Sequence, residues 1–203
     1  MRRTNKPEVI RQAAQHLFLR NGLRETSVDA IAAAARVTKQ TVYRYYRGKN
    51  ELFVDALGGL VAEQVSVSIA DAQPDAPVSP AELETRLRTV AGRIVNEALE
   101  PTYLALLRVV ITEAPQFPDL ARHFREVVIE RFTTDLTRLL TSQHVAPILT
   151  VPSVDTAVRL FIGPLVAYLM EALMHEPDAV KRRAHKELPA LMTLLVRAIA
   201  APA

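Results

Sequence analysis

Apolar side chains recur at intervals of three and four residues along most of the chain, and this spacing is the strongest restriction on its fold. Near the N-terminus Ile10, Ala13, Ala14, Leu17 and Phe18 fall on one stripe of a helix. No segment shows the sustained alternation of apolar and polar residues that marks a half-buried strand. The sequence therefore predicts an all-α protein without a sheet.

Capping residues and helix breakers divide the chain into separate helices. Pro7 can open the first helix and Gly22 can close it. Thr26, with Asp29 three residues later, forms a capping-box signature for a short second helix, and Thr38 is a good N-cap for a third. The predicted helices after these caps cover residues 39–46, from 51 toward 69, 80–99, 102–113, 118–141, 153–174 and 178–200.

One linker stands out between these helices. Residues 71–80 contain three prolines, and Ser79 combines with Pro80 and Glu82 as an N-cap, an N1 proline and an N3 acid for the helix that follows. We expect a first domain over residues 1–56 and a second over residues 57–203.

Charge is distributed unevenly between these two parts. Residues 1–56 carry eleven Lys or Arg against five Asp or Glu, a net charge of +6, whereas the remainder has a net charge of −3. A compact basic segment on a mildly acidic body is typical of a polyanion-binding head on a separate scaffold.

Composition excludes several classes of protein and site. The chain has no cysteine, which rules out a disulfide scaffold, a thiol nucleophile and a thiolate metal site. The longest strongly apolar uncharged run, residues 160–170, contains Pro164 and falls short of the ~20 residues that a membrane span needs. No signal-type apolar stretch follows the basic N-terminus, so we expect a cytoplasmic protein that has no membrane partner.

The second and third helices, joined by about three residues around Arg36 and Val37, have the lengths and caps of a helix-turn-helix. The third helix is short, polar and basic on its outer face. Such a helix can enter the major groove of DNA with its N-terminal end first. A solvent-exposed polar helix with ordinary caps is the alternative explanation for this segment taken alone.

Residues 10–53 closely resemble the DNA-binding head of the TetR family of transcriptional regulators. The shared text is Ile10-x-x-Ala13-Ala14-x-x-Leu17-Phe18, Gly22, Thr26-Ser27-Val28-x-x-Ile31-Ala32-x-x-Ala35, and Val37-Thr38-Lys39-x-Thr41-Val42-Tyr43-x-Tyr45-Tyr46-x-x-Lys49-x-x-Leu52-Phe53. The resemblance implies an N-terminal three-helix head joined to an α-helical body for dimerisation and effector binding. The positions that it implies, together with the turn, give these expected DNA contacts: Ser27, Arg36, Thr38, Lys39, Gln40, Thr41, Tyr43, Arg44, Tyr45 and Lys49.

The chain departs from the family pattern at three positions. Arg36 stands where the family usually has glycine in the turn, so either the turn differs or Arg36 is held at positive φ at a cost of about 1 kcal/mol, offset by a phosphate contact. Gln40 replaces a frequent glycine, and its amide could bond an adenine edge. Tyr46 replaces a common phenylalanine, so its hydroxyl needs a partner or solvent.

The second part of the chain is similar to the AefR-type C-terminal domain within that family, on the segment from Leu106 to Phe124. The resemblance implies a homodimer on a double-stranded DNA operator and a small-molecule effector. Two apolar stripes are expected either to form the dimer interface or to close the core of one subunit: Val154, Val158, Phe161, Leu165 and Leu169, and Leu188, Leu191, Leu195 and Ile199. The expected effector-lining residues are Tyr103, Leu107, Phe124, Phe132, Phe161, Tyr168 and Met174.

The function predicted from these features is that of a sequence-specific DNA-binding regulator, a ligand-responsive repressor that needs no cofactor. A transcriptional activator, or a regulator that binds DNA without a ligand, explains the same residues. A helical adaptor would leave the basic helix without a role. No His-Glu-x-x-His pair, metal constellation or glycine-rich phosphate loop supports an enzyme.

Overall fold

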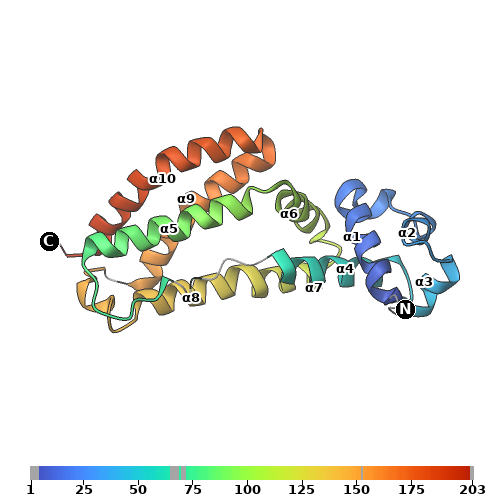
Figure 1. Cartoon of the computed structure of the whole chain (residues 1–203), viewed down its shortest axis with the longest axis horizontal. Coiled ribbons are helices and arrows are strands. Elements are labelled where there is room, and N and C mark those ends of the chain that lie inside the picture. Colours follow the sequence, from blue (N-terminus) through green and yellow to red (C-terminus); the bar gives the residue numbers. More distant parts are fainter. Residues whose placement is uncertain (1–4, 65–68, 70–71, 152, 202–203) are drawn as a thin grey trace. The chain divides into compact units, whose positions relative to one another are not determined.

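The computed structural model describes residues 5–64, 69, 72–151 and 153–201, with the side chains of 61–64 left aside. Its α-helices are labelled in Figure 1. Over the described residues the chain is helical and has no strand, only one isolated bridge between Leu149 and Ala200. The prediction of an all-α fold is confirmed.

The chain divides into two compact units. Unit 1 contains residues 1–65 and 105–128, and unit 2 contains residues 66–104 and 129–203. These units differ from the segments 1–56 and 57–203, because the segment 105–128 is grouped with the N-terminal helices, and the domain boundary at residue 56 stays a prediction. The long helix α6 (Pro101–Glu113) starts in unit 2 and continues into unit 1.

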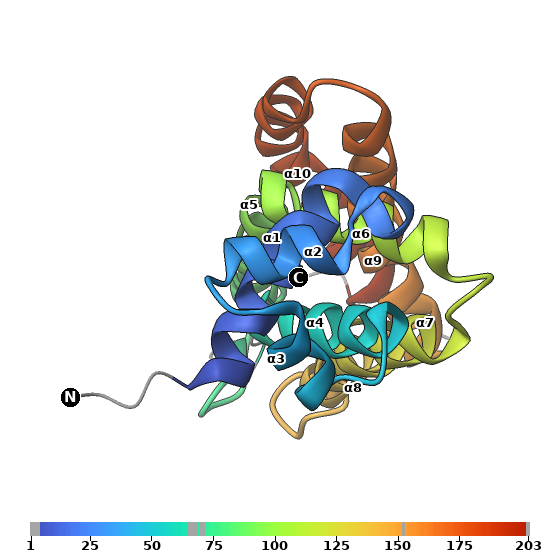
Figure 2. The same ribbon diagram turned by 90° about the vertical axis from the view of Figure 1, so that its right-hand side faces the viewer.

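Unit 1 packs four N-terminal helices and α7 around an aromatic centre. The rings of Phe18 and Phe53 meet edge to face at 5.0 Å, and Phe53 also contacts Phe117 at 5.1 Å. Both Phe18 and Phe53 are fully buried, so these contacts join α1, α4 and the turn before α7. Besides the end of α6, the α-helices of this unit are α1 (Lys6–Glu25), α2 (Val28–Ala34), α3 (Lys39–Tyr45), α4 (Lys49–Gln64) and α7 (Pro118–Phe124). The first four are seen close together in Figure 2.

Of two helix boundaries predicted in unit 1, the break at Gly22 is present and the N-cap of α2 is displaced by one residue. Gly22 interrupts α1 at φ 75°, a conformation that glycine adopts without steric cost, so the predicted break is confirmed there. The N-cap of α2 is Ser27, whose Oγ accepts a hydrogen bond from the Ala30 N–H, and the prediction of Thr26 for this role was wrong. Thr26 is buried and its hydroxyl donates to the Gly22 carbonyl oxygen at 2.7 Å, because it faces α1.

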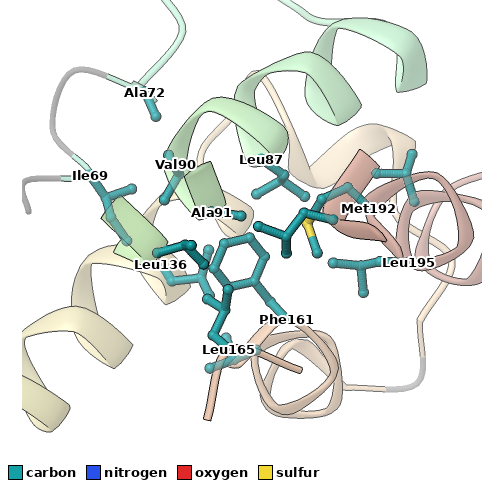
Figure 3. Packing of buried hydrophobic residues seen from close by; sticks show 14 of the residues in the cluster. Ile69, Ala72, Leu87, Val90, Ala91, Leu136, Phe161, Leu165, Met192 and Leu195 are labelled. Carbon is teal, nitrogen blue, oxygen red and sulfur yellow. The ribbon is translucent and has the colours of Figure 1, made fainter. Parts of the chain in front are cut away.

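Unit 2 is built on the packing of α10 (Pro177–Ile199) against α5 (Pro80–Ala98) and α9 (Val154–Met174). Figure 3 shows its core, in which Leu87 of α5, Phe161 of α9 and Met192 of α10 converge. The capping box of α5 is confirmed: the Ser79 N–H donates to Glu82, and Ser79 Oγ accepts from the Glu82 N–H.

The run predicted as one helix over residues 118–141 is helical throughout but is not one α-helix. A π-helical segment η2 (Arg125–Glu130) separates α7 from α8 (Arg131–Leu140). The boundary between the two units falls inside η2. The predicted continuation of α4 toward Ile69 runs through residues 65–68, which lie outside the described residues.

The two apolar stripes predicted near the C-terminus lie mostly inside unit 2. Phe161, Leu165 and Leu188 are each less than a tenth exposed, and Val158, Leu195 and Ile199 are buried with them. Of the two expected roles, these side chains therefore close the core of one subunit. The opposite face of α9 is also apolar but exposed, and it carries Leu160, Val166, Met170 and Met174.

Because both of its faces are apolar, α9 is unusually apolar for a helix of this chain. It is the one helix among the described residues whose length and composition would allow it to cross a membrane. In unit 2 this helix packs against α5, α8 and α10, and a third of its most apolar stretch is buried within the chain.

Candidate nucleic-acid interface

The turn between α2 and α3 is a Schellman motif. The Val37 N–H donates to the Ala32 carbonyl at 2.9 Å, and the Arg36 N–H donates to the Ala33 carbonyl at 3.1 Å. This pattern requires the residue after the C-cap to adopt the left-handed conformation, and Arg36 has φ 53°. Of the two alternatives for the glycine position, the strained turn is therefore the one present, at a cost of about 1 kcal/mol.

Helix α3 is set by its N-cap and one buried anchor. Thr38 Oγ1 accepts from the Thr41 N–H at 3.2 Å, and its hydroxyl also pairs with that of Thr41 at 2.9 Å. Val42 is buried and fixes the rotation of the helix against the rest of unit 1. The other side of the short helix is thereby left for solvent, as the sequence predicted.

The ten expected contact residues all lie in unit 1: Ser27 caps α2, Arg36 lies in the turn, Lys49 begins α4, and the others lie on α3 or at its N-cap. Tyr43 and Tyr45 are 48% and 40% exposed, large values for aromatic side chains in a small unit. Ser27, Arg36, Thr38, Lys39, Gln40 and Arg44 are exposed as well, while Thr41 and Lys49 are partly buried. This surface thus presents hydroxyl, amide, guanidinium and ammonium groups, the donors that bind phosphates and base edges.

Lys39 and Arg44 on this surface already have side-chain partners. Lys39 Nζ lies 2.8 Å from Asp29 Oδ2, and this hydrogen bond raises the pKa of the Lys39 ammonium above its ordinary value. The Arg44 guanidinium carbon lies 5.1 Å from the centre of the Tyr45 ring. Nη2 of Arg44 also donates a hydrogen bond to the Tyr45 hydroxyl. The ring therefore holds the guanidinium close to the helix surface.

Lys49, one of the expected DNA contacts, makes hydrogen bonds within unit 1. Its ammonium donates to the Leu23 carbonyl oxygen at 2.8 Å and to that of Arg24 at 3.4 Å, at the C-terminal end of α1. A cation stabilises the last carbonyls of a helix. The hydrogen bonds give Lys49 a structural role in joining α1 to α4, and its DNA contact stays a prediction.

The hydroxyl of Tyr46, which a phenylalanine at this position would lack, has a hydrogen-bond partner. It donates to Asp55 Oδ2 at 2.8 Å, which ties the C-cap of α3 to α4. Burial raises the pKa of Tyr46 far above its ordinary value, and the bond to Asp55 adds to the shift. Neither Asp55 nor the partnership of Asp29 with Lys39 was foreseen from the sequence, since nine and ten residues separate the members of each pair.

The expected effector-lining residues are divided between the two units. Leu107 and Phe124 belong to unit 1 and the other five to unit 2. In unit 2 the rings of Phe132 and Phe161 stack at 6.1 Å, whereas Met174 is 75% exposed at the end of α9. Among the described residues no group of three or more His, Asp or Glu could hold a metal ion.

Tyr168 has a polar environment within this set. Its hydroxyl donates to Glu187 Oε2 at 2.6 Å, and the Arg183 guanidinium lies over its ring at 5.8 Å. Burial, followed by the bond to Glu187, raises the pKa of Tyr168 to about 12. These contacts join α9 to α10, so Tyr168 already has a structural role.

Two family models match the chain. Residues 10–56 match the model of bacterial regulatory proteins of the TetR family, and residues 85–189, more than half of the chain, match that of the AefR-like transcriptional repressor C-terminal domain. The HTH-type transcriptional repressor SCO4008 of Streptomyces coelicolor is 36% identical over 73 residues, which are 36% of this chain and 34% of that protein. The matched segments thus span about a third or less of the curated relatives.

Solved structures resemble the chain over nearly its whole length. The Flavonoid-responsive Regulator FrrA has a TM-score of 0.65 and 28% identity, with 98% of each chain covered. A TetR transcriptional regulator from Agrobacterium tumefaciens has a TM-score of 0.75 and 20% identity, with 98% of this chain and 96% of that one covered, a likeness in fold. From these matches and the helix-turn-helix of unit 1, the chain belongs to the TetR family of bacterial regulatory proteins and has a C-terminal domain of the AefR-like type.

Proposed function

We propose that this protein is a cytoplasmic, sequence-specific DNA-binding regulator that represses transcription as a homodimer on a palindromic operator. The observation that carries the proposal is α3, a short helix anchored through Val42 with its polar and cationic side turned to solvent. Membership of a family of regulators rather than enzymes agrees with it. Lys39, Gln40 and Thr41 follow the N-cap of α3 and are the side chains that we assign to base edges and nearby phosphates.

The remaining expected contacts hold the DNA backbone in this proposal. Ser27 uses its oxygen to accept the Ala30 N–H, and its hydroxyl hydrogen is available to a phosphate at the N-terminus of α2. The guanidiniums of Arg36 and Arg44 are exposed and match phosphate geometry. Such contacts position the helix in the groove and make the affinity strongly dependent on salt.

Dimerisation is assigned to the exposed apolar side chains of α9 and α10. Met170 and Met174 on α9 and Leu194 on α10 are 38%, 75% and 61% exposed, and α9 packs along α10. A second copy brought up by a two-fold axis would bury the same face on both subunits. Sedimentation should show a dimer at micromolar concentration, and Met170→Glu combined with Leu194→Glu should shift it to monomer. A native monomer, or no shift, rejects this interface.

The effector is proposed to be a small molecule that prefers the conformation unable to bind the operator. A ~100-fold preference between the two conformations corresponds to ~2.7 kcal/mol of coupling. FrrA is flavonoid-responsive by its name, and an aromatic ligand would suit rings such as Phe132 and Phe161. An activator, or a regulator that acts without ligand, remains the alternative, to be separated by transcription assays on the recovered operator.

Selection of bound duplexes from a random pool tests the core of the proposal. A recovered palindrome, with half-sites about one helical turn or slightly more apart, would establish sequence-specific binding and two-fold symmetry together. Binding to that duplex should weaken steeply as salt rises. Recovery of no enriched sequence, with no binding at low salt, would refute the function.

A further inference from the structure

An ion pair between α2 and α3 lies on the surface that we propose to bind DNA. Lys39, the first residue of α3, lies 2.8 Å through its Nζ from Asp29 Oδ2 in the first turn of α2. Asp29 is the one acid between Ser27 and Tyr46, a segment that also carries three cations. The inference drawn from this pair rests on the proposed function.

The ion pair between Lys39 and Asp29 contributes little to the stability of the fold. The side chains of Lys39 and Asp29 are 50% and 67% exposed, and exposed pairs of this kind add little to folding. The pair faces the solvent that DNA would displace. While it is intact, the Lys39 ammonium is locally neutralised and cannot replace a counterion at a phosphate.

We propose that Asp29 is a specificity-determining residue that withholds Lys39 from the DNA backbone and so lowers sequence-independent affinity. An ammonium that gives one hydrogen to Asp29 keeps two further N–H donors. Those donors can still reach the O6 and N7 acceptors of a guanine in the major groove. The ion pair therefore weakens the contact of Lys39 with the DNA backbone, which is the same in every sequence. It does not weaken a contact with a correctly placed guanine.

Asp29→Asn tests the proposal, since it keeps the shape of an exposed side chain and removes its charge. On a duplex of unrelated sequence, the slope of log affinity against log salt should become steeper by about 0.9, the value for one additional phosphate contact. The variant should then lose about 3.5-fold more affinity than the native protein between 50 and 200 mM salt, by the same relation. Its ratio of operator to unrelated-sequence affinity should fall, since the gain is confined to the backbone.

Asp119→Asn is the matched control. Asp119 pairs with Arg122 at 2.7 Å, both side chains are largely exposed, and the residue lies in the same unit on α7, which packs on α4. This variant changes the net charge equally and should keep the native salt slope. A slope that steepens as much in the control would overturn the role of Asp29, because net charge alone would explain the result.

A double variant identifies the cation that is released. Asp29→Asn combined with Lys39→Gln should return the salt slope on unrelated DNA to the native value. A slope that stays steep in the double variant, or one that Asp29→Asn leaves unchanged, overturns the inference. If the native protein binds no selected duplex, the proposed function fails instead, so the two failures are distinguishable.

Discussion

The strained residue in the turn, Arg36, gives a prediction that separates folding from DNA binding. Its φ of 53° lies where a side chain costs about 1 kcal/mol and glycine costs nothing sterically. Arg36→Gly and Arg36→Ala both remove the guanidinium, but only glycine relieves the strain. We therefore expect Arg36→Gly to be more stable than Arg36→Ala by about 1 kcal/mol, or about 2–4 °C in Tm for a chain of this size.

Denaturant unfolding and salt-dependent DNA binding are the two measurements. Both Arg36 variants should lose the same affinity for the operator, and the salt slope of each should decrease by about 0.9 if the lost guanidinium held one phosphate. Ala34→Gly is the matched control, because Ala34 is exposed in the last turn of α2, where glycine destabilises by about 0.5–1 kcal/mol. Equal stability of the two Arg36 variants would refute the strain.

Three other substitutions, one of them with a matched control, test packing, a hydrogen bond and a cap. Leu87→Ala removes a fully buried side chain from the core of unit 2 and should destabilise the protein by about 2–5 kcal/mol in denaturant unfolding. Tyr46→Phe loses the hydrogen bond to Asp55 and should cost about 0.5–1.5 kcal/mol, whereas Tyr43→Phe, on an exposed ring, should cost nothing measurable. Ser79→Ala breaks the capping box of α5 and should cost about 1 kcal/mol in thermal unfolding; no change in Tm would contradict the cap.

Local signals were sufficient for the helices and for the helix-turn-helix. These signals act within a few residues, so they can be recognised in the sequence: the apolar periodicity, an N-cap such as Thr38 and a helix breaker such as Gly22. The cap of α2 was misplaced by one residue because Thr26 and Ser27 both carry a hydroxyl. Only the packing of Thr26 on α1 decides between them.

Contacts between helices were beyond the reach of the sequence pattern. The bond from Lys49 to the Leu23 carbonyl spans 26 residues, and it depends on how α4 meets the end of α1. The role of α9 was ambiguous for another reason. Phe161 and Met170 are both apolar, yet one is 1% and the other 38% exposed, so apolar spacing could not separate the core face from the exposed one.

The size of α3 provides a physical reason for the dimer that we propose on the exposed face of α9. Seven helical residues extend about 10 Å, which spans about three base pairs. At about 1–3 kcal/mol for each mismatched pair, one head discriminates by about 3–9 kcal/mol. Selection of one site among 10⁶ or more competitors requires about 8 kcal/mol or more, at the upper end of that range. Two heads double the discrimination, so a single-subunit form, such as the doubly substituted Met170 and Leu194 variant, should keep only about half of the native protein's free energy of discrimination between operator and unrelated DNA.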